Sequence, residues 1–170
     1  MKTACFVLRA QPFHLGHLRA IEWILRKYEK LIVIIGSSQE SHTEENPFTF
    51  EERKEMIEKS LKSRGIEKER YEIIGIPDFH NDKAWVEYIL KRASFDVVFT
   101  RNPWTKRCFE SFKIPVKEHP LFGNTSGSKI REMIKKGEKW EKLVPKEVRK
   151  ILKNIDLKER FKDKDTRQFS

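Results

Sequence analysis

The stretch Arg9-Ala10-Gln11-Pro12-Phe13-His14-Leu15-Gly16-His17 joins two segments of different character. The apolar run 5–8 precedes it and predicts a short buried strand. Apolar residues at helical spacing follow it and predict a helix over about 16–29. Two histidines and a glycine therefore lie on a strand-to-helix turn. In an α/β sheet such a turn lies at the carboxyl edge, where these folds bind ligands.

The chemistry of this turn suits phosphate. The first turn of a helix carries unpaired backbone N–H groups and a partial positive charge. Gly16 has no Cβ, so backbone there can approach a ligand closely. His14 and His17 are three residues apart, which places both on one side of the first helical turn. A His-x-x-His spacing alone is weak, but the flanking strand, helix and Gln-Pro-Phe sequence favour a functional site.

The rest of the chain alternates strand and helix patterns. The β-branched run 31–35 ends at Gly36 and is typical of a parallel strand buried on both faces. With the first strand and helix it forms a βαβ unit, whose crossover should be right-handed. Further strands are expected at 71–76, 96–99 and 115–118. The sequence predicts an α/β fold: a Rossmann-like open parallel sheet of five to six strands, helices on both faces and a helical C-terminal segment.

Length and composition limit the class of protein. A chain of 170 residues is about one domain, and we expect it over 1–155, followed by a charged tail over 156–170. No apolar run approaches the roughly 20 residues of a membrane span, so no membrane partner is expected. Cys5 and Cys108 do not suggest a disulfide framework, which favours a cytoplasmic protein with reduced thiols.

The net charge of +10 allows two interpretations. One is binding to nucleic acid. The other is a polyphosphate-binding enzyme with a lysine-rich solvated surface, and acids interspersed along the chain favour it. Trp104, Lys106 and Arg107 look exposed and motivate the rival hypothesis of a nucleotide- or RNA-binding module without turnover.

A second turn has similar chemistry. The run Thr125-Ser126-Gly127-Ser128-Lys129-Ile130-Arg131 opens a helix that should end at Gly137. Its hydroxyls and N–H groups would form a second anion-binding helix end, with Arg131 one turn in; the alternative is a Ser cap beside a solvated Arg. The sequence has no Ser nucleophile elbow, zinc cluster or Walker lysine loop. Positioning chemistry on phosphates is therefore favoured over a covalent intermediate.

Several motifs together resemble the archaeal nicotinamide-mononucleotide adenylyltransferases of the His-x-Gly-His nucleotidyltransferase superfamily. The first is the stretch 9–18 quoted above. The others follow in family order between about residues 36 and 145: Gly36-Ser37-Ser38-Gln39-x-Ser41-His42-Thr43, Asn46-Pro47-Phe48-Thr49, Asn81-x-x-x-Trp85-Val86, Ser126-Gly127-Ser128-x-Ile130-Arg131 and Gly137-Glu138-Lys139-Trp140-x-x-Leu143-Val144-Pro145.

The resemblance implies transfer of AMP from ATP to nicotinamide mononucleotide (NMN), giving NAD and pyrophosphate, with Mg²⁺ and in a homo-oligomer. It implies catalytic roles for His14, His17 and Arg131. It places ATP against Arg9, Gln11, Phe13, Gly16, Ser126, Gly127 and Ser128. It places the acceptor against Ser37, Ser38, Asn81 and Trp85, with Trp85 stacked on the nicotinamide ring.

The chain also departs from the family pattern. Leu8 and Ala10 flank Arg9 where the family has Gly and Phe, and Arg101 stands where it often has Gly. Glu132 and Met133 follow Arg131 where the family often has further arginines. These departures leave a second possibility, a paralogue that adenylylates another phosphate such as phosphopantetheine or flavin mononucleotide.

Overall fold

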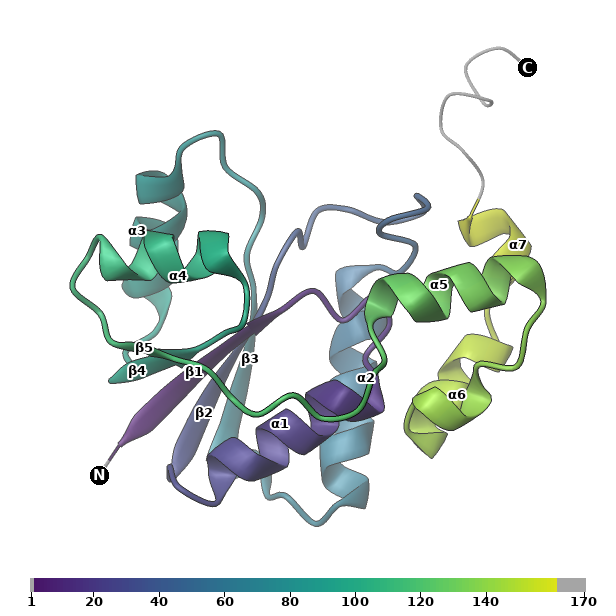
Figure 1. Cartoon of the computed structure of the whole chain (residues 1–170), viewed down its shortest axis with the longest axis horizontal. Helices are drawn as coiled ribbons and strands as arrows, with labels where there is room; N and C mark the ends of the chain where they lie inside the picture. Colours follow the sequence, from purple (N-terminus) through teal and green to yellow (C-terminus); the bar gives the residue numbers. More distant parts are fainter. Residues whose placement is uncertain (1, 162–170) are drawn as a thin grey trace.

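The computed structural model of the chain describes residues 2–161 (Figure 1). In this part of the chain, parallel strands form one five-stranded sheet in the order β3-β2-β1-β4-β5, which confirms the predicted fold. The strands are β1 (Thr3–Leu8), β2 (Lys30–Ile35), β3 (Tyr71–Gly75), β4 (Val97–Phe99) and β5 (Val116–Lys117).

The helices begin close to where the sequence predicts them. They are α1 (Leu15–Leu25), α2 (Phe50–Ser63), α3 (Asp82–Arg92), α4 (Pro103–Glu110), α5 (Gly127–Lys136), α6 (Lys146–Lys153) and α7 (Leu157–Arg160), with single 3₁₀ turns η1 (Lys68–Arg70) and η2 (Glu141–Leu143).

One predicted boundary was wrong. α1 ends at Leu25 rather than near 29, because the chain must turn there to enter β2, and the Glu29 N–H already donates to the Lys2 carbonyl (3.2 Å). Asn81 caps α3: its side chain accepts a hydrogen bond from the Ala84 N–H (3.1 Å). An N-cap side-chain oxygen satisfies one of the donors that the first helical turn leaves unpaired.

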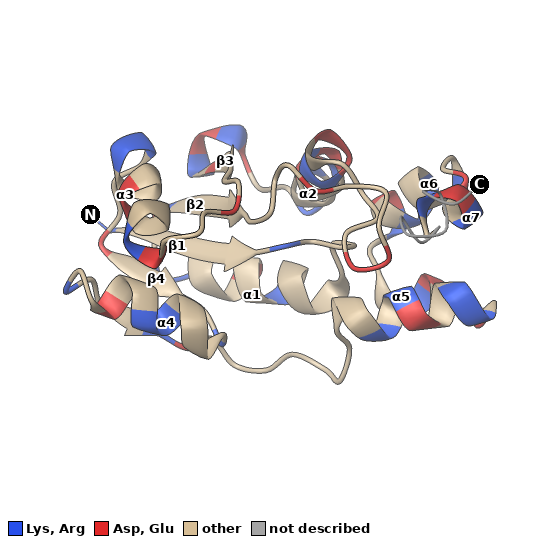
Figure 2. Cartoon of the chain, turned by 90° about the horizontal axis from the view of Figure 1, so that it is seen from above, with Lys and Arg blue, Asp and Glu red and all other residues tan. Residues whose placement is uncertain are grey.

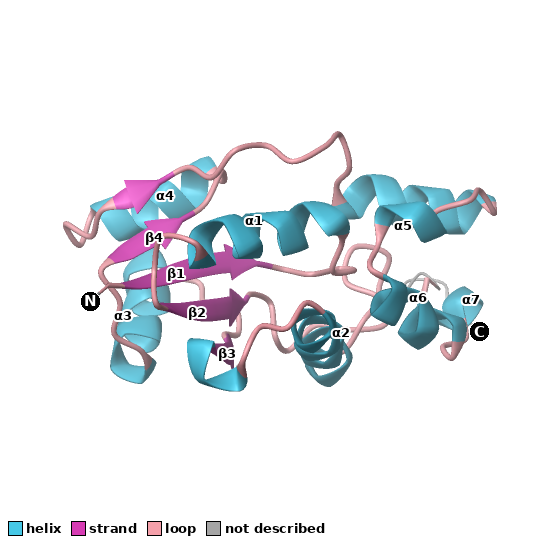
Figure 3. Ribbon diagram, turned by 90° about the horizontal axis from the view of Figure 1, so that it is seen from below, coloured by secondary structure: helices cyan, strands magenta, loops and turns pink. Residues whose placement is uncertain are grey.

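The helices cover both faces of the sheet (Figure 3). Side chains of β1 alternate between the faces, so Phe6 and Leu8 pack with α1, α2 and the C-terminal helices. Cys5 points to the opposite face and packs with residues of α3 and α4, such as Val86 and Phe109. Burial on both faces explains why β2 is apolar from Leu31 to Ile35, after the exposed Lys30 at its start.

The strand order reverses at β1. The chain runs from β1 to β2 and β3 on one side, and then returns to β4 and β5 on the other. The loops that follow β1 and β4 therefore diverge at the carboxyl edge and leave a crevice there, which is the usual ligand site of such sheets.

The C-terminal segment packs on the domain as far as the structure describes it. Asp156, the first residue of the predicted tail, caps α7, and Arg160 binds both carboxylate oxygens of Glu52 and the Pro47 carbonyl (3.2 Å). Residues 162–170 of that tail lie outside the described residues. No helix among residues 2–161 is long and apolar enough to cross a membrane.

Arg53 of α2 is fully buried and binds backbone only. Its Nη1 donates to the carbonyls of Arg9 (3.1 Å) and Gly36 (2.9 Å). Its Nη2 donates to the carbonyls of Ser37 (3.1 Å) and Glu40 (3.4 Å), and its Nε donates to the Thr49 carbonyl (3.2 Å). All five guanidinium donors are thus used, and they hold the loops after β1 and β2 together.

We expect Arg53→Met to lower the free energy of unfolding by about 3 kcal/mol or more, because it removes five hydrogen bonds from a fully buried group, among them those to the Arg9 and Gly36 carbonyls. Urea denaturation followed by tryptophan fluorescence measures the change. Lys59→Met is the control, since Lys59 is exposed on the same helix and its loss should change stability by less than about 0.5 kcal/mol. Equal stabilities for the two variants would contradict this role of Arg53.

Candidate active site

The first corner of the site is residues 10–17, between β1 and α1. His14 caps α1: its Nδ1 accepts hydrogen bonds from the N–H groups of Gly16 (3.1 Å) and His17 (3.4 Å). In return, His17 Nδ1 accepts from the His14 N–H (3.2 Å), and the two rings stack with centroids 3.6 Å apart. Because each Nδ1 accepts a hydrogen bond, the proton of each neutral ring is on Nε2. Both imidazoles therefore present an N–H donor.

Gly16 is required by this stack. A Cβ at Gly16 would lie 2.9 Å from the His14 ring and 3.3 Å from the Phe122 carbonyl oxygen. Behind the pair, the Phe13 ring stacks on His17 with centroids 5.5 Å apart. The corner also holds Ala10 at a φ of 55°, a left-handed conformation that costs energy in a residue with a side chain.

Burial keeps both imidazoles neutral. It lowers the pKa of His14 from 6.5 to about 4. The pKa of His17 lies well below its ordinary value, because of burial first and then the neighbouring His14 and His119. At neutral pH these rings therefore act as hydrogen-bond donors and not as cations.

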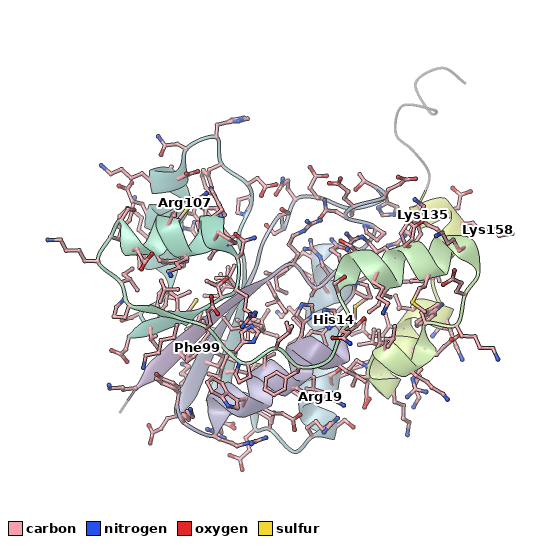
Figure 4. All side chains as sticks on the ribbon, viewed as in Figure 1. His14, Arg19, Phe99, Arg107, Lys135 and Lys158 are labelled. Atoms are coloured by element: carbon pink, nitrogen blue, oxygen red, sulfur yellow. The ribbon has the colours of Figure 1, made fainter. Side chains whose placement is uncertain are left out.

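The second corner is residues 125–131, where the chain enters α5. Ser126 caps α5 by accepting from the Lys129 N–H (3.1 Å). Arg131 extends back to the first corner: its Nη1 donates to the Gln11 carbonyl (2.8 Å) and its Nη2 to Ser128 Oγ (3.2 Å). A Cβ at Gly127 would lie 2.9 Å from Arg131 Nη1, so glycine is what permits this contact. His14 lies where the amino ends of α1 and α5 approach each other (Figure 4).

Both corners line one cavity of about 510 Å³. The first corner contributes His14, Gly16 and His17, and the second contributes Ser126 and Gly127. Residues 100–103, which follow β4, close the cavity on another side. The two predicted phosphate-binding helix ends therefore face the same space.

A second cavity, of about 270 Å³, adjoins the first. The two share lining residues at the carboxyl ends of β1 and β4, among them Leu8, Thr100 and Asn102. The smaller cavity brings together Arg9, Ser37 and Trp85 from different loops and helices. A still larger groove of about 680 Å³ between α2 and α6 contains neither corner, so we do not place the active site there.

Some predicted site residues lie behind the cavities. Phe13 has no exposed surface, and Gln11 is 2% exposed. Gln11 exchanges two hydrogen bonds with the Phe48 backbone, at 3.1 and 2.9 Å, which fixes the loop after β2. Neither side chain has surface for ATP, because both are part of the packing that supports the first corner. Ser38, Asn81, Ser128 and Arg131 also lie outside the lining of both cavities.

The site carries excess positive charge. Burial lowers the pKa of Arg131, and nearby Arg9 lowers it further, while Glu45 opposes the change. Burial and the charge of Arg9 likewise lower the pKa of Arg53 to about 10, so it stays protonated at neutral pH. The Arg9 guanidinium thus lies close enough to Arg53 and Arg131 to repel both, and an anion beside Arg9 would relieve the repulsion.

The structure adds one imidazole that the sequence analysis did not select. His119 lines the larger cavity, and its ring meets Phe6 edge to face with centroids 5.4 Å apart. Its Nδ1 donates to the Pro120 carbonyl (2.9 Å), so in the neutral ring Nε2 is an acceptor, the opposite of His14 and His17. Its position just after β5, at the same sheet edge, was the available sequence signal.

No group of three or more His, Cys, Asp or Glu residues in the described part of the chain could hold a metal ion. A doubly wound parallel sheet with paired imidazole donors and a second anion-binding helix end at its switch point defines a nucleotide-binding protein of the nucleotidyltransferase class.

Comparison with known proteins agrees with this assignment to the nucleotidyltransferases. Residues 9–162 match the cytidylyltransferase-like family. Nicotinamide-nucleotide adenylyltransferase of Saccharolobus solfataricus is 42% identical over 96% of both chains. The protein of the same name from Archaeoglobus fulgidus is 39% identical, over 98% of this chain and 99% of its own.

Among solved structures, the fold is similar to a bifunctional NMN adenylyltransferase/ADP ribose pyrophosphatase of Francisella tularensis, complexed with AMP and manganese. The TM-score is 0.79 at 23% identity, and the match covers 92% of this chain but only 51% of that one. The chain thus belongs to the cytidylyltransferase-like family and, within it, to the nicotinamide-nucleotide adenylyltransferases.

The neutral state of His14 predicts a pH dependence of stability. Its pKa is 6.5 when exposed and about 4 in the folded chain, so the unfolded chain binds more protons between these values. Stability should therefore fall as pH is lowered from about 6.5 to 4, by up to about 3 kcal/mol from this residue. His14→Phe keeps an aromatic ring but does not titrate. Urea denaturation at several pH values should show a flatter dependence for the variant, and parallel curves would contradict the prediction.

Proposed function

We propose that this nucleotidyltransferase transfers AMP from ATP to NMN, giving NAD and pyrophosphate. The observation that carries the proposal is the single cavity lined by both phosphate-suited corners and joined to a second cavity. The larger cavity would hold ATP and the smaller one the acceptor. The names of the full-length relatives support this choice of substrates.

In this proposal His14 and His17 act as neutral donors. Their Nε2–H groups would bind the phosphates of ATP and stabilise the charge that develops on the departing pyrophosphate. Fixed donors in a partly buried site are effective because they need little reorganisation during the reaction.

The second corner would bind the same phosphates. The α5 amino end offers the N–H groups that follow Ser126, and Ser128 offers a hydroxyl. Arg131 uses one N–H on the Gln11 carbonyl and one on Ser128, which leaves further donors for phosphate. Arg9 lines the smaller cavity and suits the phosphate of the acceptor. Holding two anionic substrates in line supplies much of the rate enhancement through orientation.

We expect His17→Ala to lower kcat by about 100- to 1,000-fold, with a small change in the KM for ATP, because the lost hydrogen bond strengthens in the transition state. Pyrophosphate release with ATP and NMN as substrates measures both constants. Arg19→Ala, exposed on the same helix, should keep the parent's kcat. Turnover of the His17 variant within a few-fold of the parent would refute this role.

We infer that Mg²⁺ enters as part of the MgATP substrate, because the described residues offer no cluster of metal ligands. EDTA should abolish pyrophosphate release. In electron paramagnetic resonance, Mn²⁺ should show the spectrum of the free ion with the protein alone and a bound spectrum once ATP is added. Tight Mn²⁺ binding without ATP would contradict this.

The departures from the family pattern make the choice of acceptor a direct test of the proposal. Pyrophosphate release from ATP with NMN, phosphopantetheine and flavin mononucleotide in parallel distinguishes adenylyl transfer to NMN from the paralogue hypothesis. Steeply salt-dependent RNA binding without pyrophosphate release would instead support the non-catalytic module. The homo-oligomer predicted from the resemblance stays a prediction.

A further inference from the structure

We propose that Trp104 and the carboxylate of Asp78 select an acceptor whose base is a positively charged aromatic ring, so that the smaller cavity takes nicotinamide mononucleotide in preference to nicotinate mononucleotide. This inference rests on the proposed function. It assigns the choice of acceptor to two residues of this chain that the sequence analysis did not place in the site.

The first argument concerns which of the two indole rings, Trp85 or Trp104, has a free face. Trp85 is only 4% exposed, because Trp104 covers it at a centroid separation of 4.8 Å and Phe109 packs edge-on at 5.6 Å. Trp104 is 38% exposed and lines the same cavity. With Trp104 in this position, an acceptor ring in the cavity contacts Trp104. Trp85 packs behind Trp104 and supports it. Part of the exposed surface that suggested an RNA-binding tryptophan therefore lies at the cavity.

The second argument is the fixed negative charge at this cavity. Asp78 lines it and follows β3. Its carboxylate accepts hydrogen bonds from Ser37 Oγ (2.9 Å) and Gln39 Nε2 (2.8 Å). Gln39 Oε1 in turn accepts from the Asp78 N–H (3.1 Å), so the amide and the carboxylate hold each other in place. An oriented carboxylate that lines the same cavity as an indole face gives an arrangement that attracts cations.

The third argument is the distribution of charge in the cavity. Arg9 lines it as well and supplies a positive group, whereas Asp78 supplies a negative one. NMN has a matching distribution, with an anionic phosphate and a cationic pyridinium ring. Nicotinate mononucleotide has a carboxylate on that ring in place of the carboxamide. This carboxylate cancels the charge of the ring and would be repelled by Asp78. Phosphopantetheine has no ring, and the flavin ring is neutral.

The size of the cavity agrees with a single ring. Its volume of about 270 Å³ lies near the lower end of ligand sites, which typically measure roughly 300–1,000 Å³. The three fused rings of a flavin would need considerably more space than one pyridinium ring.

Steady-state kinetics test the role of Trp104. Trp104→Leu should raise the KM for NMN about tenfold, because it removes the aromatic face, whereas Trp104→Phe should raise it by less than about threefold. The KM for ATP should not change. Trp23→Phe is the control, since Trp23 lines neither cavity and already carries Lys27 over its ring at 4.1 Å. It should keep the parent's constants.

Asp78→Asn tests the charge while keeping a side chain of the same shape. The parent should have a higher kcat/KM for NMN than for nicotinate mononucleotide. The variant should lower that ratio about tenfold, because the amide neither attracts the pyridinium nor repels the extra carboxylate. A parent that prefers nicotinate mononucleotide, or a ratio unchanged in the variant, would overturn the inference.

A binding measurement without ATP separates this inference from the proposed function. NMN should quench tryptophan fluorescence and give an indole–pyridinium charge-transfer absorption in the parent and in Trp23→Phe, but not in Trp104→Leu. If the parent forms NAD while Trp104→Leu keeps both the signal and the KM, the inference fails and the proposed function stands. If the signal depends on Trp104 but no pyrophosphate is released, the inference stands and adenylyl transfer to NMN fails.

Discussion

The geometry of this site depends on a buried guanidinium that binds no carboxylate. Arg53 gives all of its donors to backbone carbonyls of the loop after β1, the loop after β2 and the start of α2. The Ser37 and Thr49 carbonyls also accept from backbone N–H groups, whereas those of Arg9 and Gly36 lie in loops that leave the sheet in unusual conformations: Ala10 and Ser37 both have positive φ. One side chain thus satisfies the polar groups that two irregular loops cannot satisfy between themselves.

Other side chains, from several parts of the chain, hold the loop after β2. Gln11 binds the Phe48 backbone, Arg9 binds the Glu45 carbonyl, and Arg160 from α7 binds the Pro47 carbonyl. Lys135 of α5 pairs with Glu44 at 3.4 Å, where the acidic loop lies beside the basic helix in Figure 2. The loop after β2 is long and polar, so these contacts, not its own packing, fix its shape. The smaller cavity, which this loop helps to line, therefore depends on residues spread from the loop after the first strand to the last helix.

The sequence predicts the fold well because its signals are local. Apolar runs predict the strands, and capping residues such as Thr49 and Ser126 mark helix starts, because both effects act within a few residues. The two corners were predictable for the same reason. The direction of a side chain was less predictable: Gln11 and Phe13 lie in the motif but point into the packing behind it. His119 and Asp78 enter the site only through the tertiary arrangement, since each follows a short strand in a region with no motif of its own.

In the proposed reaction the neutral imidazoles and the charged arginines would have separate tasks. The guanidinium groups would attract phosphate from a distance, and that attraction would act on substrate and product alike. His14 and His17 are uncharged and would contribute little until a phosphate lies against their N–H groups, where the interaction grows with the negative charge on the oxygen. Burial that removes their charge would therefore make them selective for the step in which charge builds on the leaving group. A cationic His pair would bind ATP more tightly but would stabilise ground state and transition state more equally, which raises affinity without raising the rate of transfer.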